Sequence, residues 1–452
     1  MTRGRPATNP PDDAFAGRRR PEAAAAAASG GGPGLELLVV AGEASGDLHG
    51  ARLLAELRRL LPGLAAFGLG GPELRAAGLE AVADSSEVAV VGVVEVLKVL
   101  PRIRQVFAAL LAAVDRRRPS AAVLIDFPDF NLRLAARLAR RGIPVIYYIS
   151  PQVWAWRRGR VRTIARRVDL MLVLFPFEVD FYRRSGVPAV HVGHPLVDEV
   201  PRLPSAWDRR LAAGEPYRLA LLPGSRRSEV EALLPVMLRA AARLAAELPV
   251  AVSLIRAPGI PEAMLAAHVE AFRREAAAAR AAQGAAAAGG AGAAQGAGAA
   301  QGAAAAGGLA LPVRVVSEDR FGAIADSHLA LCASGTATLE VGLLGTPMVV
   351  LYRLARWSYV VAKLLVRLPN FAMVNLVLGR EVVPELLQGE AEPERIAAEA
   401  RRLLAGGEAL ARMRAGLAEL RPRLGEGGAS ARAARQVAEV LARARGAGGL
   451  AA

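Results

Sequence analysis

Short runs of branched apolar residues alternate along most of the chain with stretches in which apolar residues recur every three or four positions. The first pattern predicts buried strands, and the second predicts amphipathic helices. The clearest predicted strands are residues 35–41, 121–125, 144–149, 169–175, 218–222, 328–332 and 348–352. The clearest helical segments between them are residues 48–60 and 131–142. Strands that alternate with helices predict an α/β protein with parallel sheets.

The strand pattern is interrupted at residues 201–217, which are rich in proline and polar side chains. We interpret this segment as the linker between two doubly wound α/β domains, residues 35–200 and 215–388. Residues 389–446 have the pattern of charged amphipathic helices without strands.

Two segments have a composition that offers little to bury. Residues 1–34 combine proline, glycine, arginine and alanine, so we expect a disordered tail. They lack the apolar stretch of a signal peptide, and export is therefore not expected. Residues 281–308 contain only alanine, glycine and glutamine, and we expect a surface insertion that does not hold a helix.

Composition narrows the class of protein. The chain has 452 residues, 53% of them apolar and 22% charged, which is typical of a globular protein. Its net charge of +15 favours anionic partners without saying which kind. A single cysteine, Cys332, excludes a disulfide framework and a cysteine-cluster metal site. The longest uncharged apolar runs, such as residues 170–177, are far shorter than the roughly 18 residues of a membrane span, so an integral membrane protein is not expected.

Ligands of open parallel sheets bind at the carboxyl ends of strands, so each strand-to-helix junction is a candidate site. At the first junction, Gly42 and Gly46 flank Ser45 beside a predicted helix. Glycines let a ligand approach the backbone, and a helix start favours an anion by about 0.3–1 kcal/mol. A tight turn in which Ser45 or Asp47 caps the helix explains these residues equally well. The G-x-G-x-x-G fingerprint is missing, which argues against a nicotinamide enzyme.

At the second junction, Asp126 lies at the end of an apolar strand with no helix to cap, so it is the candidate general base. A carboxylate that only orders the loop is the alternative. Asp129 follows Pro128 and precedes a periodic run, so we expect it to be the N-cap of the next helix.

Six arginines fall within residues 157–167, directly after Trp154 and Trp156. Aromatic residues interleaved with arginines occur in nucleic-acid-binding proteins. Here the arginines follow helical spacing without an RNA-binding motif, which favours a solvated or phosphate-facing helix. The two tryptophans are expected to pack in the core.

The turn after the predicted strand 218–222 places Arg226 directly before a helix, which Ser228 and Glu231 are expected to start as a capping box. An arginine at that position can clamp a diphosphate. A surface arginine is the alternative, and the motif of a Walker loop is absent.

The predicted strand 328–332 leads into a loop of small residues, Ser334 to Thr336, and then into a helix. Glu340 lies one helical turn from Thr336 on the same face. Loop amides can hold phosphate while the carboxylate holds sugar hydroxyls. Acidic residues are also common near helix starts because of the helix dipole, so this pattern alone is modest.

Nine blocks occur in a fixed order over residues 35–445. They are AGEASGD (41–47), VGVVEVL (91–97), IDFPDFN (125–131), SPQVWAWRRGRV (150–161), LFPFE (174–178), VGHPLVD (192–198), LALLPGSRRSEV (219–230), SGTATLE (334–340) and GREVVPELLQ (379–388). Together they resemble the lipid-A-disaccharide synthases, glycosyltransferases of lipopolysaccharide assembly in Gram-negative bacteria. Gln152 stands where the family often has a small residue, and FAMVN (371–375) is only similar to the family's usual S-L-P-N.

The resemblance implies an α/β fold of the GT-B type, with two Rossmann-like doubly wound domains and C-terminal helices that pack back on the first domain. It implies transfer of 2,3-diacylglucosamine from UDP to the 6-hydroxyl of 2,3-diacylglucosamine 1-phosphate. The products would be UDP and a β-1,6-linked lipid A disaccharide 1-phosphate, formed with inversion.

The resemblance also assigns site residues. Asp126 matches the catalytic aspartate of the family. Gly42, Ser45 and Gly46 are assigned to the acceptor side, and Arg226, Ser334, Gly335, Thr336, Glu340 and Asn375 to UDP-sugar binding. No cofactor is implied, and the absence of a D-x-D motif makes metal unexpected.

The implied partners are UDP-2,3-diacylglucosamine, 2,3-diacylglucosamine 1-phosphate and the inner-membrane surface, with a homodimer left open and no nucleic acid. The enzyme would be cytoplasmic and peripherally bound to that membrane. Residues 87–107 are the first candidate docking segment and residues 357–368 the second, although a buried core helix explains the first equally well. Three alternatives remain: another GT-B enzyme such as a UDP-N-acetylglucosamine epimerase or a peptidoglycan glycosyltransferase, a basic nucleic-acid-binding protein, and an inactive scaffold.

Overall fold

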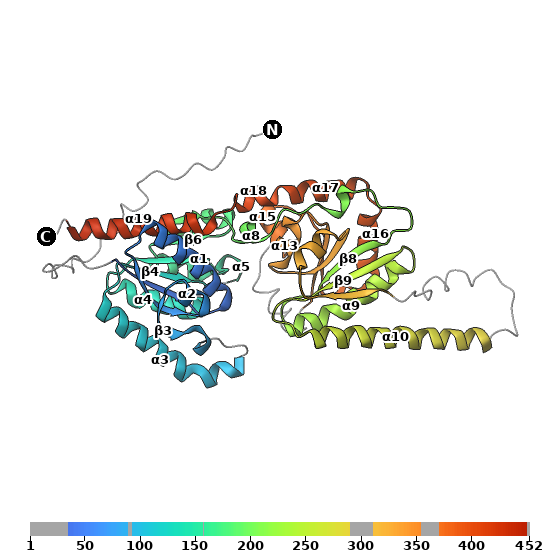
Figure 1. Ribbon diagram of the computed structural model, residues 1–452, viewed down its shortest axis with the longest axis horizontal. Coiled ribbons are helices and arrows are strands. Elements are labelled where there is room, and N and C mark those ends of the chain that lie inside the picture. Colours follow the sequence, from blue (N-terminus) through green and yellow to red (C-terminus); the bar gives the residue numbers. More distant parts are fainter. Residues whose placement is uncertain (1–34, 89–92, 157, 290–310, 354–369, 450–452) are drawn as a thin grey trace. The chain divides into compact units, whose positions relative to one another are not determined.

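The structure is a computed structural model that describes residues 35–88, 93–156, 158–289, 311–353 and 370–449 (Figure 1). The predicted tail, the second docking candidate 357–368, Arg157 and part of residues 87–107 lie outside the described residues. The chain divides into two compact units. Unit 1 is Met1–Pro195 with Gly427–Ala452, and unit 2 is Leu196–Glu426.

Unit 1 contains a parallel sheet of seven strands in the order β3-β2-β1-β4-β5-β6-β7. Its strands are β1 (Glu36–Ala41), β2 (Ala65–Gly70), β3 (Glu80–Asp84), β4 (Ala121–Ile125), β5 (Val145–Tyr148), β6 (Leu170–Val173) and β7 (Ala189–His191). Its helices are α1 (Ala44–Leu60), α2 (Pro72–Ala76), α3 (Val93–Arg117), α4 (Pro128–Ala139), α5 (Val153–Trp156), α6 (Val161–Ala165), α7 (Pro176–Arg183) and α19 (Ala429–Gly449).

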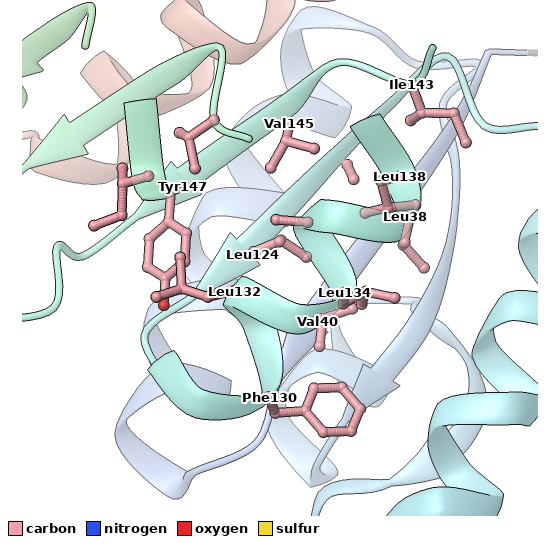
Figure 2. Packing of buried hydrophobic residues seen from close by; sticks show 14 of the residues in the cluster. Leu38, Val40, Leu124, Phe130, Leu132, Leu134, Leu138, Ile143, Val145 and Tyr147 are labelled. Atoms are coloured by element: carbon pink, nitrogen blue, oxygen red, sulfur yellow. The ribbon is translucent and has the colours of Figure 1, made fainter. Parts of the chain in front are cut away.

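The central strands of unit 1 are buried on both faces, as their continuous apolar runs predict. Side chains alternate between the two faces, so that Leu38 and Val40 lie on the same side of the sheet as Leu124. Figure 2 shows these residues packed with apolar side chains of α4, including Leu134 and Leu138. The period of about four residues along α4 supplies the matching apolar stripe.

Unit 2 contains a parallel sheet of six strands in the order β10-β9-β8-β11-β12-β13. Its strands are β8 (Tyr217–Leu222), β9 (Val250–Ile255), β10 (Val313–Val316), β11 (Leu329–Ala333), β12 (Met348–Tyr352) and β13 (Glu385–Leu387). Its helices are α8 (Leu196–Glu199), α9 (Arg227–Ala245), α10 (Glu262–Gly289), α12 (Arg320–Ala325), α13 (Ala337–Leu343), α15 (Met373–Leu378), α16 (Pro393–Leu404), α17 (Gly407–Ala418) and α18 (Leu420–Leu424).

The segment interpreted as a linker is part of unit 2. The chain passes from unit 1 to unit 2 between Pro195 and Leu196. Further along, the Trp207 indole N–H donates to the backbone oxygen of His328 at 2.8 Å. The proline-rich composition of residues 201–217 therefore marks an irregular segment held beside the start of β11. The chain passes from unit 1 to unit 2 before this segment.

Of the C-terminal helices, α19 alone among the described ones belongs to unit 1, where it packs along α1 (Figure 1). Helices α16, α17 and α18 stay in unit 2, and α16 packs on α9. The return to the first unit thus begins at Gly427, much later than residue 389.

The start of the alanine-rich insertion is helical, contrary to expectation. Helix α10 continues as far as Gly289 and so includes residues 281–289. Alanine has the highest helix propensity, and this outweighs a single glycine at position 284. The rest of the insertion lies outside the described residues.

In each sheet the strand order reverses direction at one place, between β1 and β4 in unit 1 and between β8 and β11 in unit 2. Ligands of doubly wound sheets bind outside the carboxyl ends of the strands at such switch points. Gly42 and Asp126 directly follow β1 and β4, and Ser334 directly follows β11. Topology alone therefore brings Gly42, Asp126 and Ser334 to the switch point of their own unit.

Candidate active site

Asp126 lies in an unusual backbone turn between β4 and α4. Asp126 and Phe127 have φ angles of 44° and 47°, in the left-handed region. The turn is held by its neighbours, because the Asp126 carbonyl accepts the Tyr147 hydroxyl at 2.5 Å and Asn131 Nδ2 at 2.8 Å. The Asp126 N–H donates to the Tyr148 oxygen at 3.1 Å. These contacts occupy the backbone of Asp126 and leave its carboxylate to act elsewhere.

The carboxyl group of Asp126 has an altered acidity. Burial, and then the negative charge of Glu43, raise its pKa to about 6, while a hydrogen bond from the Phe127 backbone opposes the shift. A carboxylate with a pKa closer to neutral is a better proton acceptor than an ordinary aspartate. The environment of Asp126 suits a general base.

The two glycines of the first junction bring α1 against the end of β4. A Cβ atom on Gly42 would overlap the Phe127 ring. A Cβ atom on Gly46 would lie 3.6 Å from Ile125 Cγ2 and 3.8 Å from the Ile125 oxygen. The close approach of the Phe127 ring thus explains Gly42, while Ser45 is exposed in the first turn of α1.

Neither Ser45 nor Asp47 caps α1, whose N-cap is Glu43 without a side-chain hydrogen bond. Asp47 is buried and acts on another element. Its carboxylate accepts backbone N–H groups of Gly71 at 2.7 Å, Glu73 at 2.9 Å and Leu74 at 3.2 Å. Asp47 therefore caps the start of α2.

Asp129 is not an N-cap, so that prediction was wrong. Phe127 occupies the N-cap position of α4, and Pro128 fills the first helical position. Asp129 is exposed in the first turn, where it pairs with Arg160 Nη2 at 2.7 Å. Arg167 Nη1 donates to the Leu132 oxygen at 2.9 Å, so two arginines of the 157–167 run hold α4 in place.

A buried polar cluster, which the sequence did not predict, lies at the carboxyl ends of β5 and β6. Glu178 of α7 is 2% exposed and accepts the Trp154 indole N–H at 3.0 Å. The Ser150 hydroxyl lies 2.8 Å from the Tyr182 hydroxyl. Trp154 packs edge-on against Phe177, with 5.0 Å between ring centroids. The available signal was an acidic residue inside the otherwise apolar run LFPFE.

In unit 2 the turn after β8 is organised by Glu229. Its carboxylate accepts the backbone N–H groups of Ser225 at 3.0 Å and Arg226 at 3.2 Å. Arg226 is the N-cap residue of α9, so Ser228 and Glu231 do not form the expected capping box. The Arg226 side chain is 79% exposed and pairs with Glu229 at 2.9 Å. Its guanidinium is thus accessible at the start of a 19-residue helix.

The small-residue loop after β11 has an open backbone. Gly335 has a φ of 155°, a conformation that residues with a side chain rarely adopt. Thr336 is exposed at the N-cap of α13, and the Ser334 hydroxyl donates to the Phe371 oxygen at 3.2 Å. Glu340 follows one turn later and accepts Arg320 Nη2 at 3.1 Å. Burial raises the pKa of Glu340, and the charge of Arg320 opposes this.

Asn375 is fully buried, and its side chain is saturated with hydrogen bonds. Its Nδ2 donates to the Val383 oxygen and to Glu385 Oε1, and its Oδ1 accepts the N–H groups of Val382 and Val383. An amide has no further capacity beyond two donors and two lone pairs. Asn375 therefore holds the segment before β13, and direct contact with a ligand would require that these bonds break.

A cavity of about 830 Å³ in unit 2 contains none of the sequence-predicted residues. It is lined in part by Arg414 and Arg421. Arg414 pairs with Asp208, and Arg421 donates to the oxygens of Val197 and Val200. These arginines already serve internal contacts, so the strand-end residues remain the better candidate site.

Within the part of the chain that the structure describes, no three histidine, cysteine, aspartate or glutamate side chains are grouped so as to hold a metal ion. The described helices also include none that is long and apolar enough to cross a membrane.

Comparison with known sequences adds an independent finding. The family model described as lipid-A-disaccharide synthetase matches residues 37–260 and 305–439. The lipid-A-disaccharide synthase of Anaeromyxobacter dehalogenans (strain 2CP-1) is 46% identical over 410 residues, which are 90% of this chain and 97% of that protein. The enzyme of the same name from Myxococcus xanthus is 45% identical over 409 residues, with the same coverage of both chains.

Solved structures show the fold. MurG of Acinetobacter baumannii matches with a TM-score of 0.50 at 12% identity, over 90% of this chain and 100% of that one. A UDP-N-acetylglucosamine 2-epimerase of Neisseria meningitidis matches with a TM-score of 0.54, again at 12% identity and with the same coverage. The calicheamicin glycosyltransferase CalG4 has a TM-score of 0.51 at 17% identity, over 90% of this chain and 98% of its own. The chain has the GT-B fold.

Proposed function

The chain belongs to the lipid-A-disaccharide synthase family, and we propose from this premise that it joins two acylated sugars. The donor is UDP-2,3-diacylglucosamine, and the acceptor is the 6-hydroxyl of 2,3-diacylglucosamine 1-phosphate. The products are the β-1,6-linked disaccharide 1-phosphate and UDP. The high identity to curated synthases outweighs the alternative of an epimerase, because the epimerase likeness rests on fold alone.

The observation that carries the proposal is the environment of Asp126. An inverting transfer needs the acceptor oxygen to attack opposite the leaving UDP, and a carboxylate must take the proton of the hydroxyl. Asp126 follows β4 at the switch point of unit 1, and its pKa of about 6 suits this task. Such a base contributes a factor of about 10²–10⁴ to the rate.

The acceptor is proposed to bind on unit 1 beside Asp126. Gly42 and Gly46 place the start of α1 next to β4, and Ser45 is exposed in its first turn. Helix starts favour anions, which suits an acceptor that carries a phosphate.

The nucleotide is proposed to bind at the switch point of unit 2. The exposed guanidinium of Arg226 and the loop Ser334-Gly335-Thr336 suit the diphosphate, and Glu340 suits the ribose hydroxyls. Arg226 and the loop amides would also stabilise the charge that develops on departing UDP, so we propose that transfer proceeds without metal. Asn375 contributes through the segment that it holds.

We also propose that the protein binds the inner-membrane surface from the cytoplasm, because both proposed substrates carry acyl chains. Each CH₂ group moved into water costs about 0.8 kcal/mol, or roughly 8 kcal/mol for a chain of ten carbons. In the described part of α3, Val106 and Leu110 are buried, while Arg102 and Arg104 are exposed. The C-terminal half of α3 is thus a core helix, and docking is proposed for the segment before Val106. A homodimer remains compatible with this scheme.

The test is mass spectrometry of the products formed from UDP-diacylglucosamine and the acylated sugar phosphate, with and without a chelator. We expect the acylated disaccharide phosphate and UDP in equal amounts in both reactions. Free monosaccharide or an epimerised nucleotide sugar would refute the transfer, and loss of product with chelator would refute metal independence.

A further inference from the structure

Glu178 is a buried carboxyl group whose two oxygens are both engaged by hydrogen-bond donors. The side chain is 2% exposed, and its two oxygens face two different N–H donors. Trp154 Nε1 donates to Oε1 at 3.0 Å, and the Phe175 N–H donates to Oε2 at 3.1 Å. Ser150 and the backbone of Leu174 add further hydrogen bonds. The NH₂ group of a glutamine would face one of these donors, so a carboxyl group satisfies both and an amide does not.

The surroundings of this carboxylate are otherwise apolar and aromatic. Trp154 and Phe175 both pack on Phe177, with ring centroids 5.0 and 5.5 Å apart, and Phe175 also contacts the His194 ring. Burial raises the pKa of Glu178 to about 7 against the opposing hydrogen bonds. A buried charge is costly, and a nonpolar side chain would fill this space at lower cost. We therefore look for the role of Glu178 in the groups that its hydrogen bonds position.

Those hydrogen bonds join the segment after β5 to the β6–α7 connection at the carboxyl edge of the unit 1 sheet. Trp154 and Ser150 belong to the segment after β5, Phe175 follows β6, and Glu178 is in α7. Tyr182 of α7 adds a second link to the same segment, since its hydroxyl lies 2.8 Å from the Ser150 hydroxyl.

The segment held in this way begins beside Asp126. The Asp126 N–H donates to the oxygen of Tyr148, the last residue of β5. Ile149 then turns the chain with a φ of 64°, which is rare for a β-branched residue and requires support from its surroundings. The contacts of Glu178 with Ser150 and Trp154 supply support directly after that turn.

We propose that Glu178 is a positioning residue for the acceptor sugar: through Trp154 and Ser150 it fixes the segment Ser150–Trp154 beside Asp126, so that the acceptor hydroxyl meets the base. The inference rests on the proposed function. If the segment is no longer fixed in advance, binding of the acceptor must order it, so the acceptor binds more weakly and its KM rises.

The test compares Glu178→Gln with Asp180→Asn, which removes the same charge from an exposed position on the same helix. We expect Glu178→Gln to raise the acceptor KM about tenfold, with the affinity for UDP, measured by calorimetry, changed less than twofold. Hydrogen exchange of residues 149–154 should become faster. Asp180→Asn should leave the acceptor KM and the exchange unchanged. A Glu178→Gln enzyme with the acceptor KM and exchange of the wild type would overturn the proposal.

Trp154→Phe provides a second route if Glu178→Gln folds poorly, because it removes the indole donor and keeps an aromatic ring. We expect Trp154→Phe to raise the acceptor KM. The double variant should have an acceptor KM no higher than that of the more affected single variant, because the two residues act through one contact. If the effects of the two substitutions on the acceptor KM were fully additive, a positioning role would be refuted. It would also be refuted if only kcat fell, in proportion to the loss of folded protein. The exchange measurement does not depend on activity. Absence of transfer by the wild type would refute the proposed function, while faster exchange in Glu178→Gln would still support the contact itself.

Discussion

Two consecutive residues with side chains, Asp126 and Phe127, adopt left-handed backbone angles at the end of β4. Aspartate tolerates this region, but a phenylalanine there costs about 1–2 kcal/mol. The hydrogen bonds from Tyr147 and Asn131 to the Asp126 carbonyl offset that cost. The sequence predicted Asp126 at the end of a strand. It could not predict the backbone turn, because the groups that hold it come from another strand and from inside α4.

Gly42 supports this turn by its lack of a side chain. In Gly42→Ala the new methyl group would overlap the Phe127 ring, and we expect the free energy of unfolding to fall by about 1–3 kcal/mol. Gly46→Ala is the matched control, since its Cβ would have ordinary contacts of 3.5–3.8 Å and alanine favours a helix. Urea unfolding of both variants is the measurement. Equal stability of the two would show that Phe127 moves without cost.

The pKa of Asp126 predicts a pH dependence of catalysis. The base must be ionised, and its pKa is raised to about 6, so kcat/KM should be maximal above that pH and fall tenfold per unit below it. Glu43→Gln removes the neighbouring negative charge that favours protonation, so the midpoint should move to lower pH. A pH profile of kcat/KM for both enzymes tests this. A midpoint that stays in place, or moves up, would contradict the assigned cause.

At the scale of elements, the start of α2 depends on a side chain from α1. Asp47 accepts three backbone N–H groups at the start of this five-residue helix. Asp47→Ala should lower the free energy of unfolding by about 2–3 kcal/mol, because buried donors lose their acceptor. Asp47→Asn keeps one carbonyl oxygen and should lose less. Denaturant unfolding measures both, and an Asp47→Ala variant as stable as the wild type would refute the capping role.

The capping predictions failed for a common reason. Asp129 and the pair Ser228 and Glu231 have the residue types of helix starts, but α4 and α9 begin two residues earlier. At α4 the left-handed turn and Pro128 set the start, and at α9 the reach of Glu229 back to Arg226 does so. Local propensity cannot discriminate between such neighbouring registers.

The strand pattern in the sequence predicted the central strands of each sheet but not most of the outer strands. All seven predicted strands are present with ends shifted by up to two residues. The strands that were not predicted are β2, β3, β7, β9, β10 and β13. They lie toward the outside of the sheets. Apart from β9 (VAVSLI), they are short, polar or interrupted by glycine, as in AAFGLG of β2. Strands buried on both faces carry the continuous apolar runs that make prediction reliable.

At the scale of the whole molecule, the chain leaves unit 1 near Pro195 and returns to it near Gly427. The family resemblance implied this return and assigned it to the C-terminal helices of residues 389–446. Helix α16 has an apolar stripe like that of α19, and nothing in the stripe says which sheet it covers. Only the contacts of α16 with α9, and of α19 with α1, separate the two.

The net charge of +15 and the acyl chains of the proposed substrates lead to a prediction for membrane binding. Vesicles with anionic lipids should sediment the protein at low salt and release it at about 0.5 M salt, because screening shortens the range of charge attraction. Arg102→Gln combined with Arg104→Gln should weaken this binding, whereas Arg239→Gln and Arg243→Gln on α9 serve as the charge-matched control. Vesicle binding that does not change with salt, or that neither pair of substitutions weakens, would count against docking through α3.

The variant Asp126→Asn tests whether Asp126 takes the proton of the acceptor hydroxyl. Asparagine has the same shape and tolerates the left-handed turn, so the fold should persist. Asp129→Asn controls for the loss of one charge three residues away. The measurement is the turnover number for disaccharide formation together with calorimetric binding of UDP. We expect Asp126→Asn to lose turnover by at least about 100-fold while UDP binding changes less than twofold. Turnover within about threefold of the wild type would show that Asp126 is not the base.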